Sequence, residues 1–206
     1  MTRVHRALAT LAATLALAAA LVDARPAIDA ATLAAEIEAD RDHISAPELA
    51  ERIMRQDPAL RVFDLRSREE YDAFHIASAS HATLDELARA SFPREASIVL
   101  YSEGSTHAAQ AWVLLRLRGV RNVHFLREGI YEWIARVREP RLAIDATPAE
   151  RAEFERAAPL SRFFGGMART SVPRSEVPDG YWTGTVSRDA PSRAAQAVAN
   201  VRRRGC

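Results

Sequence analysis

The chain has 206 residues, and its 28 basic and 27 acidic residues give a formal net charge of +1 at pH 7. This near-neutral balance excludes a general electrostatic affinity for nucleic acid. The single cysteine, Cys206, is the last residue, so a disulfide within the chain is excluded and oxidation can only link Cys206 to another molecule.

The N-terminal 24 residues have the pattern of a secretory signal peptide. A basic head is followed by an apolar run over residues 7–22, which is too short for a comfortable membrane span. We expect cleavage after Ala24, with Ala20 as the alternative site, and a mature protein that is periplasmic or secreted. An uncleaved N-terminal anchor is the competing interpretation, and only in that case would the membrane be a partner.

Beyond this segment, the pattern predicts short apolar strands that alternate with helices. Small polar residues stand where helices begin, and Ser45 is followed three residues later by Glu48, as in a capping box. The expected strands are residues 43–44, 61–65, 81–82, 98–101 and 122–126. The expected helices are residues 29–42, one after Ser45, one from Ser67 to Ile76, 84–90, 106–118 with Gly119 as its C-cap, and 130–137.

This alternation predicts the α/β class, with an open parallel sheet that is covered by helices on both faces. In such sheets, ligands bind beyond the carboxyl ends of the strands. The most informative stretch is therefore residues 97–107, where a buried strand runs through a short polar loop into a helix. Backbone N–H groups and the helix dipole favour an anion at such a loop.

Residues from about 44 to 138 resemble the rhodanese family in several spaced motifs that occur in the same order. The matching segments are Val62–Tyr71, His75–Ala79, Ile98–Tyr101 with its loop, and Gly119–Val123 through Gly129 and Trp133. The resemblance implies a rhodanese-like fold in which the loop after the fourth strand carries the sulfurtransferase chemistry.

The departures from the family pattern fall at the expected site. The family loop begins with the cysteine that carries the persulfide, and this chain has Ser102 there. His107 stands at the sixth loop position, which is often arginine. The family's Pro-Gly and Gly-Gly pairs are here Ala77-Ser78 and Glu128-Gly129.

A serine at the nucleophile position removes the family's chemistry. A thiol at a helix N-terminus ionises near neutral pH, whereas a hydroxyl is a far weaker acid and cannot hold a sulfane sulfur. We therefore expect no intact catalytic residue and no activity as a sulfurtransferase. The loop, whose length is kept, remains as a predicted anion-binding loop made of Ser102, Glu103, Gly104, Ser105, Thr106 and His107.

Two other interpretations of these polar residues stay open. His107 can serve in principle as a base for Ser102 in a hydrolytic site, although no carboxylate in the motif orients it. The favoured interpretation of Asp64, Arg66, Glu70 and His75 is structural, as residues that tie loops together by hydrogen bonds and ion pairs.

The composition changes past Pro140. Thr147 and Glu150 predict a capping box for a helix from 148 to 158, and residues 170–191 are rich in Pro, Ser, Gly and Asp. A last helix is expected over 193–201. The predicted organisation is a signal peptide (1–24), an N-terminal helix (25–42), a rhodanese-like domain (43–140), a helical extension (141–168), and an extended arm with a terminal helix (169–206).

Two classes of function follow. In the first, the protein is an exported, catalytically silent module that binds a small oxyanion or sulfur compound, or a protein partner through the C-terminal arm. In the second, it is a sulfur-carrier or redox protein that uses the Cys206 thiol, and the domain supplies only the binding loop. The sequence predicts no metal site, no cofactor and no nucleic-acid partner.

Overall fold

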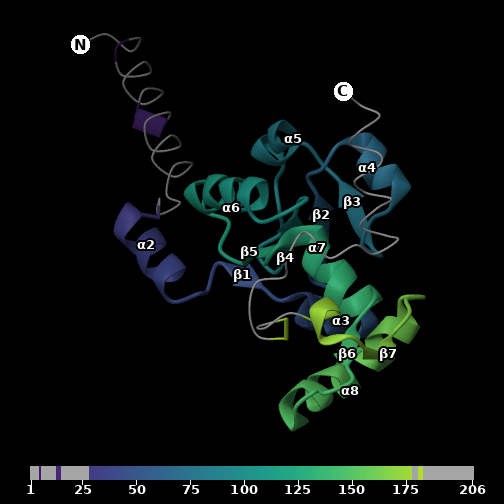
Figure 1. The fold of residues 1–206 in the computed structure, drawn as a ribbon. Helices are drawn as coiled ribbons and strands as arrows, with labels where there is room; N and C mark the ends of the chain where they lie inside the picture. The colour runs from purple at the N-terminus through teal and green to yellow at the C-terminus, as the bar shows by residue number, and fades with distance from the viewer. Residues whose placement is uncertain (1–4, 6–12, 15–27, 178–180, 183–206) are drawn as a thin grey trace.

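The computed structural model describes residues 5, 13, 14, 28–177, 181 and 182. Five parallel strands form the central sheet in the order β1-β5-β4-β2-β3 (Figure 1). The strands are β1 (His43–Ile44), β2 (Leu60–Asp64), β3 (Ala79–His81), β4 (Ser97–Tyr101) and β5 (Val123–Leu126). Most of the expected signal segment and all of the expected terminal helix lie outside the described residues.

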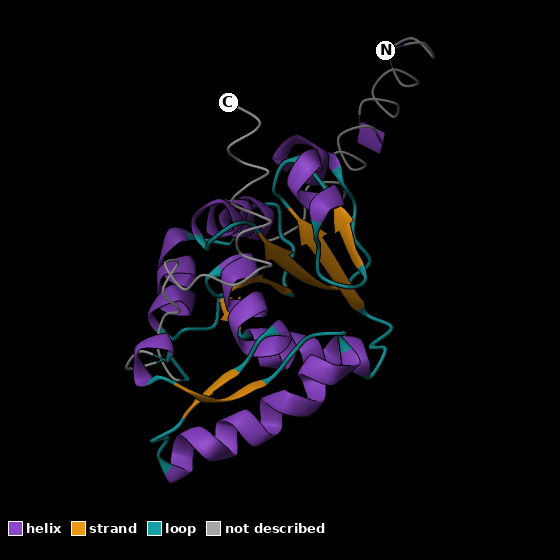
Figure 2. Ribbon diagram, turned by 45° about the vertical axis from the view of Figure 1, so that its right-hand side comes forward, coloured by secondary structure: helices purple, strands orange, loops and turns teal. Residues whose placement is uncertain are grey.

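Helices cover both faces of this sheet, which confirms the predicted architecture (Figure 2). One face packs against α3 (Ala46–Met54), α7 (Gly129–Glu132) and the π-helix η1 (Trp133–Arg138). The other face packs against α2 (Ala30–Glu38), α5 (Leu84–Arg89) and α6 (Thr106–Leu117). The short helix α4 (Arg68–Ala73) has no buried residue. β4 is buried at every position, because it lies in the middle of the sheet.

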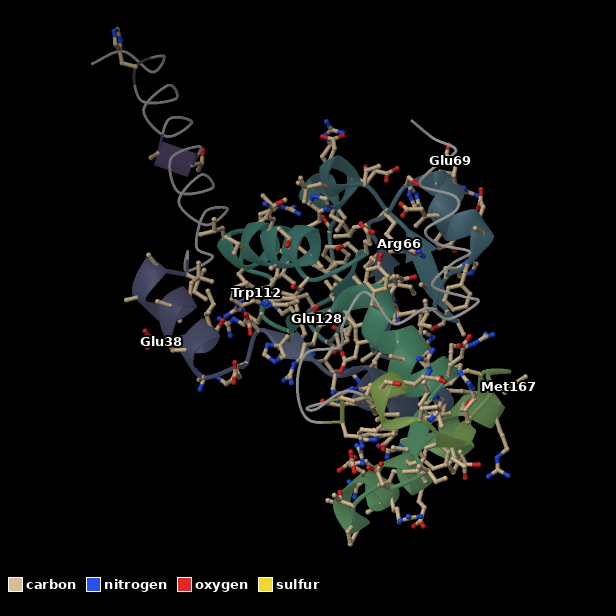
Figure 3. All side chains as sticks on the ribbon, in the orientation of Figure 1. Glu38, Arg66, Glu69, Trp112, Glu128 and Met167 are labelled. Carbon is tan, nitrogen blue, oxygen red and sulfur yellow. The ribbon has the colours of Figure 1, made fainter. Side chains whose placement is uncertain are left out.

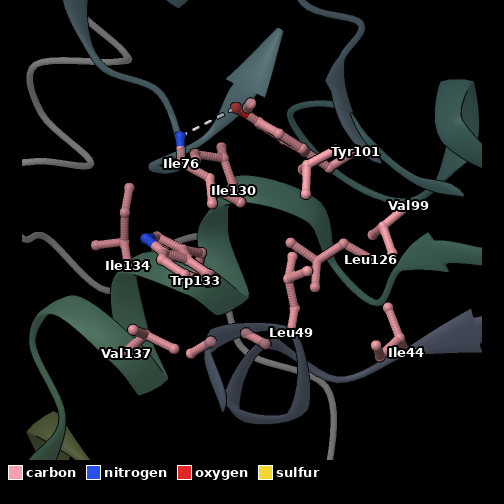
Figure 4. Packing of buried hydrophobic residues seen from close by; sticks show 14 of the residues in the cluster. Ile44, Leu49, Ile76, Val99, Tyr101, Leu126, Ile130, Trp133, Ile134 and Val137 are labelled. Carbon is pink, nitrogen blue, oxygen red and sulfur yellow. Dashed lines mark hydrogen bonds between the residues drawn. The ribbon is translucent and has the colours of Figure 1, made fainter. Parts of the chain in front are cut away.

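The first of these faces carries the larger apolar core. Leu49 on α3 points toward Leu126 on β5, and Val99 and Trp133 belong to the same cluster (Figure 4). The Tyr101 ring is fully buried among them, and its hydroxyl accepts a hydrogen bond from the N–H group of Ile76 at 3.1 Å. This core therefore ties the end of β4 to the segment that precedes β3.

The polar residues at the predicted helix starts act as caps. The side chains of Ser45, Ser67, Thr83 and Thr147 each accept a hydrogen bond from the backbone three residues later. The capping box is complete at Ser67, Thr83 and Thr147. At Ser45 the described hydrogen bonds include the one from the Glu48 N–H group to the serine hydroxyl, but none from the Ser45 N–H group to the Glu48 carboxylate. The caps thus fix where the chain turns from strand into helix.

Several predicted helix limits were wrong. α2 ends at Glu38, and Asp40 has a left-handed φ of 52°. Ile37, in its last turn, is 47% exposed. α4 ends at Ala73 because the next residue, Phe74, is extended. Helix α8 (Pro148–Phe163) continues five residues beyond the expected end.

The longer course of α8 has a tertiary cause. Pro159 lies inside this helix, and a proline there removes one backbone hydrogen bond. The residues that follow compensate: Leu160 is buried in the main core, and the hydroxyl of Ser161 donates to the Arg138 carbonyl at 2.9 Å. Packing on the domain outweighs the local preference to end the helix.

The C-terminal part forms a second small unit. Strands β6 (Arg141–Ala143) and β7 (Arg169–Val172) pair in parallel, α8 connects them, and the 3-10 helix η2 (Arg174–Glu176) follows. Tyr181 and Trp182 are buried in the apolar cluster of this unit. The predicted boundary at residue 168 therefore does not separate two structures, because β7, expected in an extended arm, pairs with a strand of the preceding segment.

None of the helices in the described part of the chain combines the length and the apolar character that crossing a membrane requires.

Candidate functional site

The candidate site is the loop that follows β4 at the carboxyl end of the sheet. Ser102 comes directly after Tyr101 and is 3% exposed. Its hydroxyl donates a hydrogen bond to the carbonyl oxygen of Gly104 at 2.6 Å. Its own carbonyl oxygen accepts from the N–H group of Ile130 at 3.0 Å. The loop is therefore held on one side by the start of α7.

Gly129 makes this close approach possible. A Cβ atom at this position would lie 2.3 Å from the carbonyl oxygen of Ser102, 2.8 Å from that of Gly104 and 3.0 Å from that of Glu103. The residue also has a left-handed φ of 57°. Only glycine satisfies both conditions at low cost. The carbonyl groups of three successive loop residues thus point at the position that a side chain at residue 129 would occupy.

The other side of the loop leads into α6. Ser105 is the N-cap residue, and its side chain makes no capping hydrogen bond. Among the described hydrogen bonds, none uses the N–H groups of Gly104, Ser105, Thr106 or His107 as donors. A helix start leaves several N–H groups without intrahelical acceptors. The predicted loop therefore contains a cluster of backbone N–H groups, those of residues 104–107, that can donate to a ligand.

The charged neighbours of the loop are also defined. The Tyr131 hydroxyl donates to the Glu103 carboxylate at 2.8 Å, which places this negative charge beside α7. His107 is exposed on the first turn of α6, and no described hydrogen bond joins its ring to the Ser102 hydroxyl. The arrangement offers no base that is positioned to activate the serine.

Asp64 and Arg66 form a buried ion pair at the carboxyl end of the neighbouring strand β2. Arg66 Nη2 donates to Asp64 Oδ2 at 2.6 Å and also to the Phe74 carbonyl at 2.6 Å. Desolvation lowers the pKa of Arg66, but the hydrogen bonds and charge of Asp64 outweigh it and raise the pKa overall. Burial, together with the Asp64 charge, likewise raises the pKa of Tyr101. The pair ties the loop after β2 to the segment before β3.

Glu70 and His75 have comparable contacts. The Glu70 side chain completes the capping box of α4. The His75 ring is exposed and stacks on Tyr71 with 4.0 Å between ring centroids. These contacts agree with the structural role that the sequence favours for both residues.

One buried ionisable group near this end of the sheet was not predicted from the sequence. Glu132 is 1% exposed, and its Oε2 atom accepts from the N–H group of Ala46 at 3.2 Å. Arg136 Nη1 lies 3.7 Å from Oε1. Burial raises the pKa of Glu132 to about 7, against the opposing effect of Arg136. The sequence held no signal for this, because a glutamate in a short helix is usually solvated.

The other predicted site residue, Cys206, lies outside the described residues. Within the described part of the chain, no group of three His, Cys, Asp or Glu side chains is placed to hold a metal ion.

Comparison with known proteins agrees with this architecture. The family model for the rhodanese-like domain matches residues 45–136. No curated protein matches the chain. The Alr3790 protein of Anabaena sp. is 31% identical over 44% of this chain and 74% of its own, with a TM-score of 0.41.

Two further solved structures are similar over the same share of this chain, 45%. A rhodanese-related protein of Thermoplasma volcanium is 26% identical over 89% of its own length, with a TM-score of 0.39. A human single-domain sulfurtransferase is 25% identical over 95% of its length, with a TM-score of 0.40. The chain belongs to the rhodanese-like family through residues 45–136, and the sheet with helices on both faces is the fold of that domain.

At two positions where this chain departs from the family pattern, a residue other than glycine has a backbone conformation that favours glycine. Ser78 and Glu128 have left-handed φ values of 68° and 50°. Because non-glycine residues are disfavoured there, we expect Ser78→Gly and Glu128→Gly each to raise the free energy of unfolding by about 0.5–1 kcal/mol. Urea denaturation measures the change. Ala77→Gly, at a neighbour without a positive φ, is the control and should destabilise; equal gains at all three positions would contradict the prediction.

Proposed function

We propose that this is an exported rhodanese-like protein that lacks the catalytic cysteine and acts as an anion- or partner-binding module. The observation that carries the proposal is Ser102, buried directly after β4 at the carboxyl end of the parallel sheet. Its hydroxyl hydrogen is donated to the Gly104 carbonyl, and a hydroxyl cannot form a persulfide. The protein then has no thiosulfate sulfurtransferase activity.

The loop geometry supports anion binding. In a trans peptide unit the N–H group points opposite to the carbonyl group. Since the carbonyl groups of residues 102–104 face Gly129, the N–H groups of residues 103–105 face away from α7. The first N–H groups of α6 add to them. Clustered amides at a helix start suit a small oxyanion, although the Glu103 carboxylate opposes a dianion.

A second candidate function uses Cys206. This is the only thiol of the chain, and it follows three arginines at residues 202–204. The arginines favour its thiolate. In this alternative, Cys206 carries sulfane sulfur or forms a mixed disulfide, and the domain supplies the binding loop.

The test of the loop begins from Cys206→Ser, which removes the only native thiol. We expect this variant to show no transfer of sulfur from thiosulfate to cyanide. Adding Ser102→Cys should restore a persulfide and weak turnover, because loop length and the start of α6 are kept. Mass spectrometry after thiosulfate treatment should show a gain of one sulfur atom at residue 102. His107→Arg and then Glu103→Arg should each raise turnover by placing positive charge beside the incoming dianion.

The outcomes separate the candidate functions. Turnover by the Cys206→Ser protein that still has Ser102 would contradict the silent module. A folded Ser102→Cys protein that takes up no sulfur would show that the loop no longer binds thiosulfate. Sulfur uptake by the native protein that disappears in Cys206→Ser would support the carrier function instead.

Export is tested independently of the loop. We expect the protein from its native host to begin at Arg25 and to occur in the periplasmic or secreted fraction. Intact-mass measurement identifies the first residue, and the mass for cleavage after Ala20 distinguishes the alternative site. A full-length chain in the membrane fraction would contradict cleavage and indicate an anchor.

A further inference from the structure

A cleft of about 750 Å³ lies at the end of the sheet opposite the loop. Ala96 and Asn122 line it, and they directly precede β4 and β5, whereas Ser102 follows β4. The rest of the lining comes from α2 and the two residues before it, from residues 90–94, and from the end of α6 with the turn that follows it. The cleft is therefore separate from the candidate site, and changes in one need not affect the other.

One wall of the cleft is an addition to the family domain. α2 lies outside residues 45–136, where the family model matches, and it packs beside α6 (Figure 1). Leu33 anchors this helix in the core under α6. The Glu36 carboxylate accepts two hydrogen bonds from the Arg116 guanidinium, one of them at 3.0 Å from Nε. α2 is thus fixed in place and closes a space that the domain alone would leave open.

Positive charge exceeds negative charge in the lining. Four arginines face two carboxylates, Asp29 and Glu36. Arg116 is paired with Glu36. Among the hydrogen bonds that the structure describes, the Arg118 guanidinium donates to the carbonyl oxygens of Leu87 and Ala90, at 2.8 and 3.0 Å.

The two remaining arginines are available to a ligand. Arg94 and Arg121 are exposed in the lining of the cleft. The hydrogen bonds and ion pairs that the structure describes include no acceptor for either guanidinium group. Such groups bind carboxylates and other oxyanions through charge-assisted hydrogen bonds.

Apolar side chains complete the lining, namely Ile28, Phe92 and Val120. We propose that this cleft binds a small amphipathic organic anion, whose acidic headgroup pairs with Arg94 and Arg121 while its apolar body packs on Phe92 and Val120. The volume is in the range of small-molecule sites, and a few polar groups beside an apolar surface are typical of them.

The probe for this site is 8-anilinonaphthalene-1-sulfonate, an apolar ring system with one anionic group, titrated into the full chain by calorimetry. Replacing both Arg94 and Arg121 with alanine should weaken binding by about tenfold or more, since charge-assisted contacts are lost. The matched control replaces Arg151 and Arg162, which are exposed on α8 and likewise have no described acceptor. This control should bind the probe as the native chain does.

Two further measurements decide the chemistry and the location. N-phenyl-1-naphthylamine, which lacks the sulfonate, should bind more weakly than the anionic probe. Amide shifts on binding should be confined to residues 28–36, 90–96 and 116–122. Equal affinity for the uncharged probe or equal losses in both double variants would overturn the proposal. So would shifts centred instead on the exposed side chains of Phe163 and Met167, of which Met167 is labelled in Figure 3.

Discussion

Replacing Gly129 with alanine is expected to lower the free energy of unfolding by about 3–5 kcal/mol, enough to unfold many domains of this size. The added Cβ would lie 2.3 Å from the Ser102 carbonyl oxygen, far inside contact distance. The added Cβ atom would clash with backbone carbonyl oxygens, so no side-chain rotation relieves the clash. The left-handed φ of 57° adds a further cost.

Gly165→Ala is the matched control for this prediction. Gly165 has a similar φ of 64°, but nothing lies within 4 Å of a Cβ built there. The Gly165→Ala substitution should lower the free energy of unfolding by about 1 kcal/mol, which is the cost of the backbone conformation alone. Urea denaturation of both variants measures the difference. If Gly129→Ala cost no more than Gly165→Ala, the loop would be free to move away from α7, and its amides would not be held in a fixed arrangement.

Glu132→Gln is expected to stabilise the protein at pH 8 by an amount of the order of 3 kcal/mol and to have little effect at pH 5. Burial raises the pKa of Glu132 to about 7 from an ordinary value of 4.5. Between these values the folded state holds a proton that the unfolded state has released. The contribution of Glu132 to stability therefore falls as the pH rises from 4.5 to 7 and stays low above it.

The variant removes this titration and keeps the main contact. The glutamine side-chain oxygen can still accept from the N–H group of Ala46, as Glu132 Oε2 does. The loss of charge opposite Arg136 opposes the gain, but desolvation is the larger effect. Unfolding is measured from pH 5 to pH 8 for the native chain, Glu132→Gln and Glu155→Gln, an exposed control on α8. As the pH rises, the free energy of unfolding of the native chain should fall relative to that of Glu132→Gln. The free energy of unfolding of Glu155→Gln should follow that of the native chain. Parallel curves for Glu132→Gln and the native chain would contradict a buried, titrating Glu132.

Much of the local structure could be predicted from the residues, because its causes are local. Alternating apolar runs and capping residues such as Ser67 and Thr83 indicated the strands and most helix starts. The same alternation gave the parallel sheet, and β4 with its loop could be located in advance as the expected ligand end. The spaced motifs predicted the rhodanese-like family over residues 44 to 138, and the family model matches residues 45–136.

Helix ends were less predictable, since tertiary contacts decide them. Ser161 and Leu160 carry α8 past Pro159 by packing on the domain. The pairing of β7 with β6 joins segments about 30 residues apart, whereas the polar composition of residues 170–191 suggested an extended arm. Such pairings depend on which surfaces meet, and residue types near the strand do not reveal that.

For the site, the sequence by itself determined which groups are present: Ser102 after a buried strand, glycine at 129 and a single thiol at the chain end. Only the tertiary structure decided how they act together. Three carbonyl groups of the loop point at Gly129, and the Tyr131 hydroxyl donates a hydrogen bond to the Glu103 carboxylate. The Glu132 carboxylate is shielded from water, with Ala46 of α3 and Arg136 of η1 beside it. The reason is physical: residue identity fixes the available donors, acceptors and charges, whereas distance and desolvation, which set their energies, arise only when remote segments pack together.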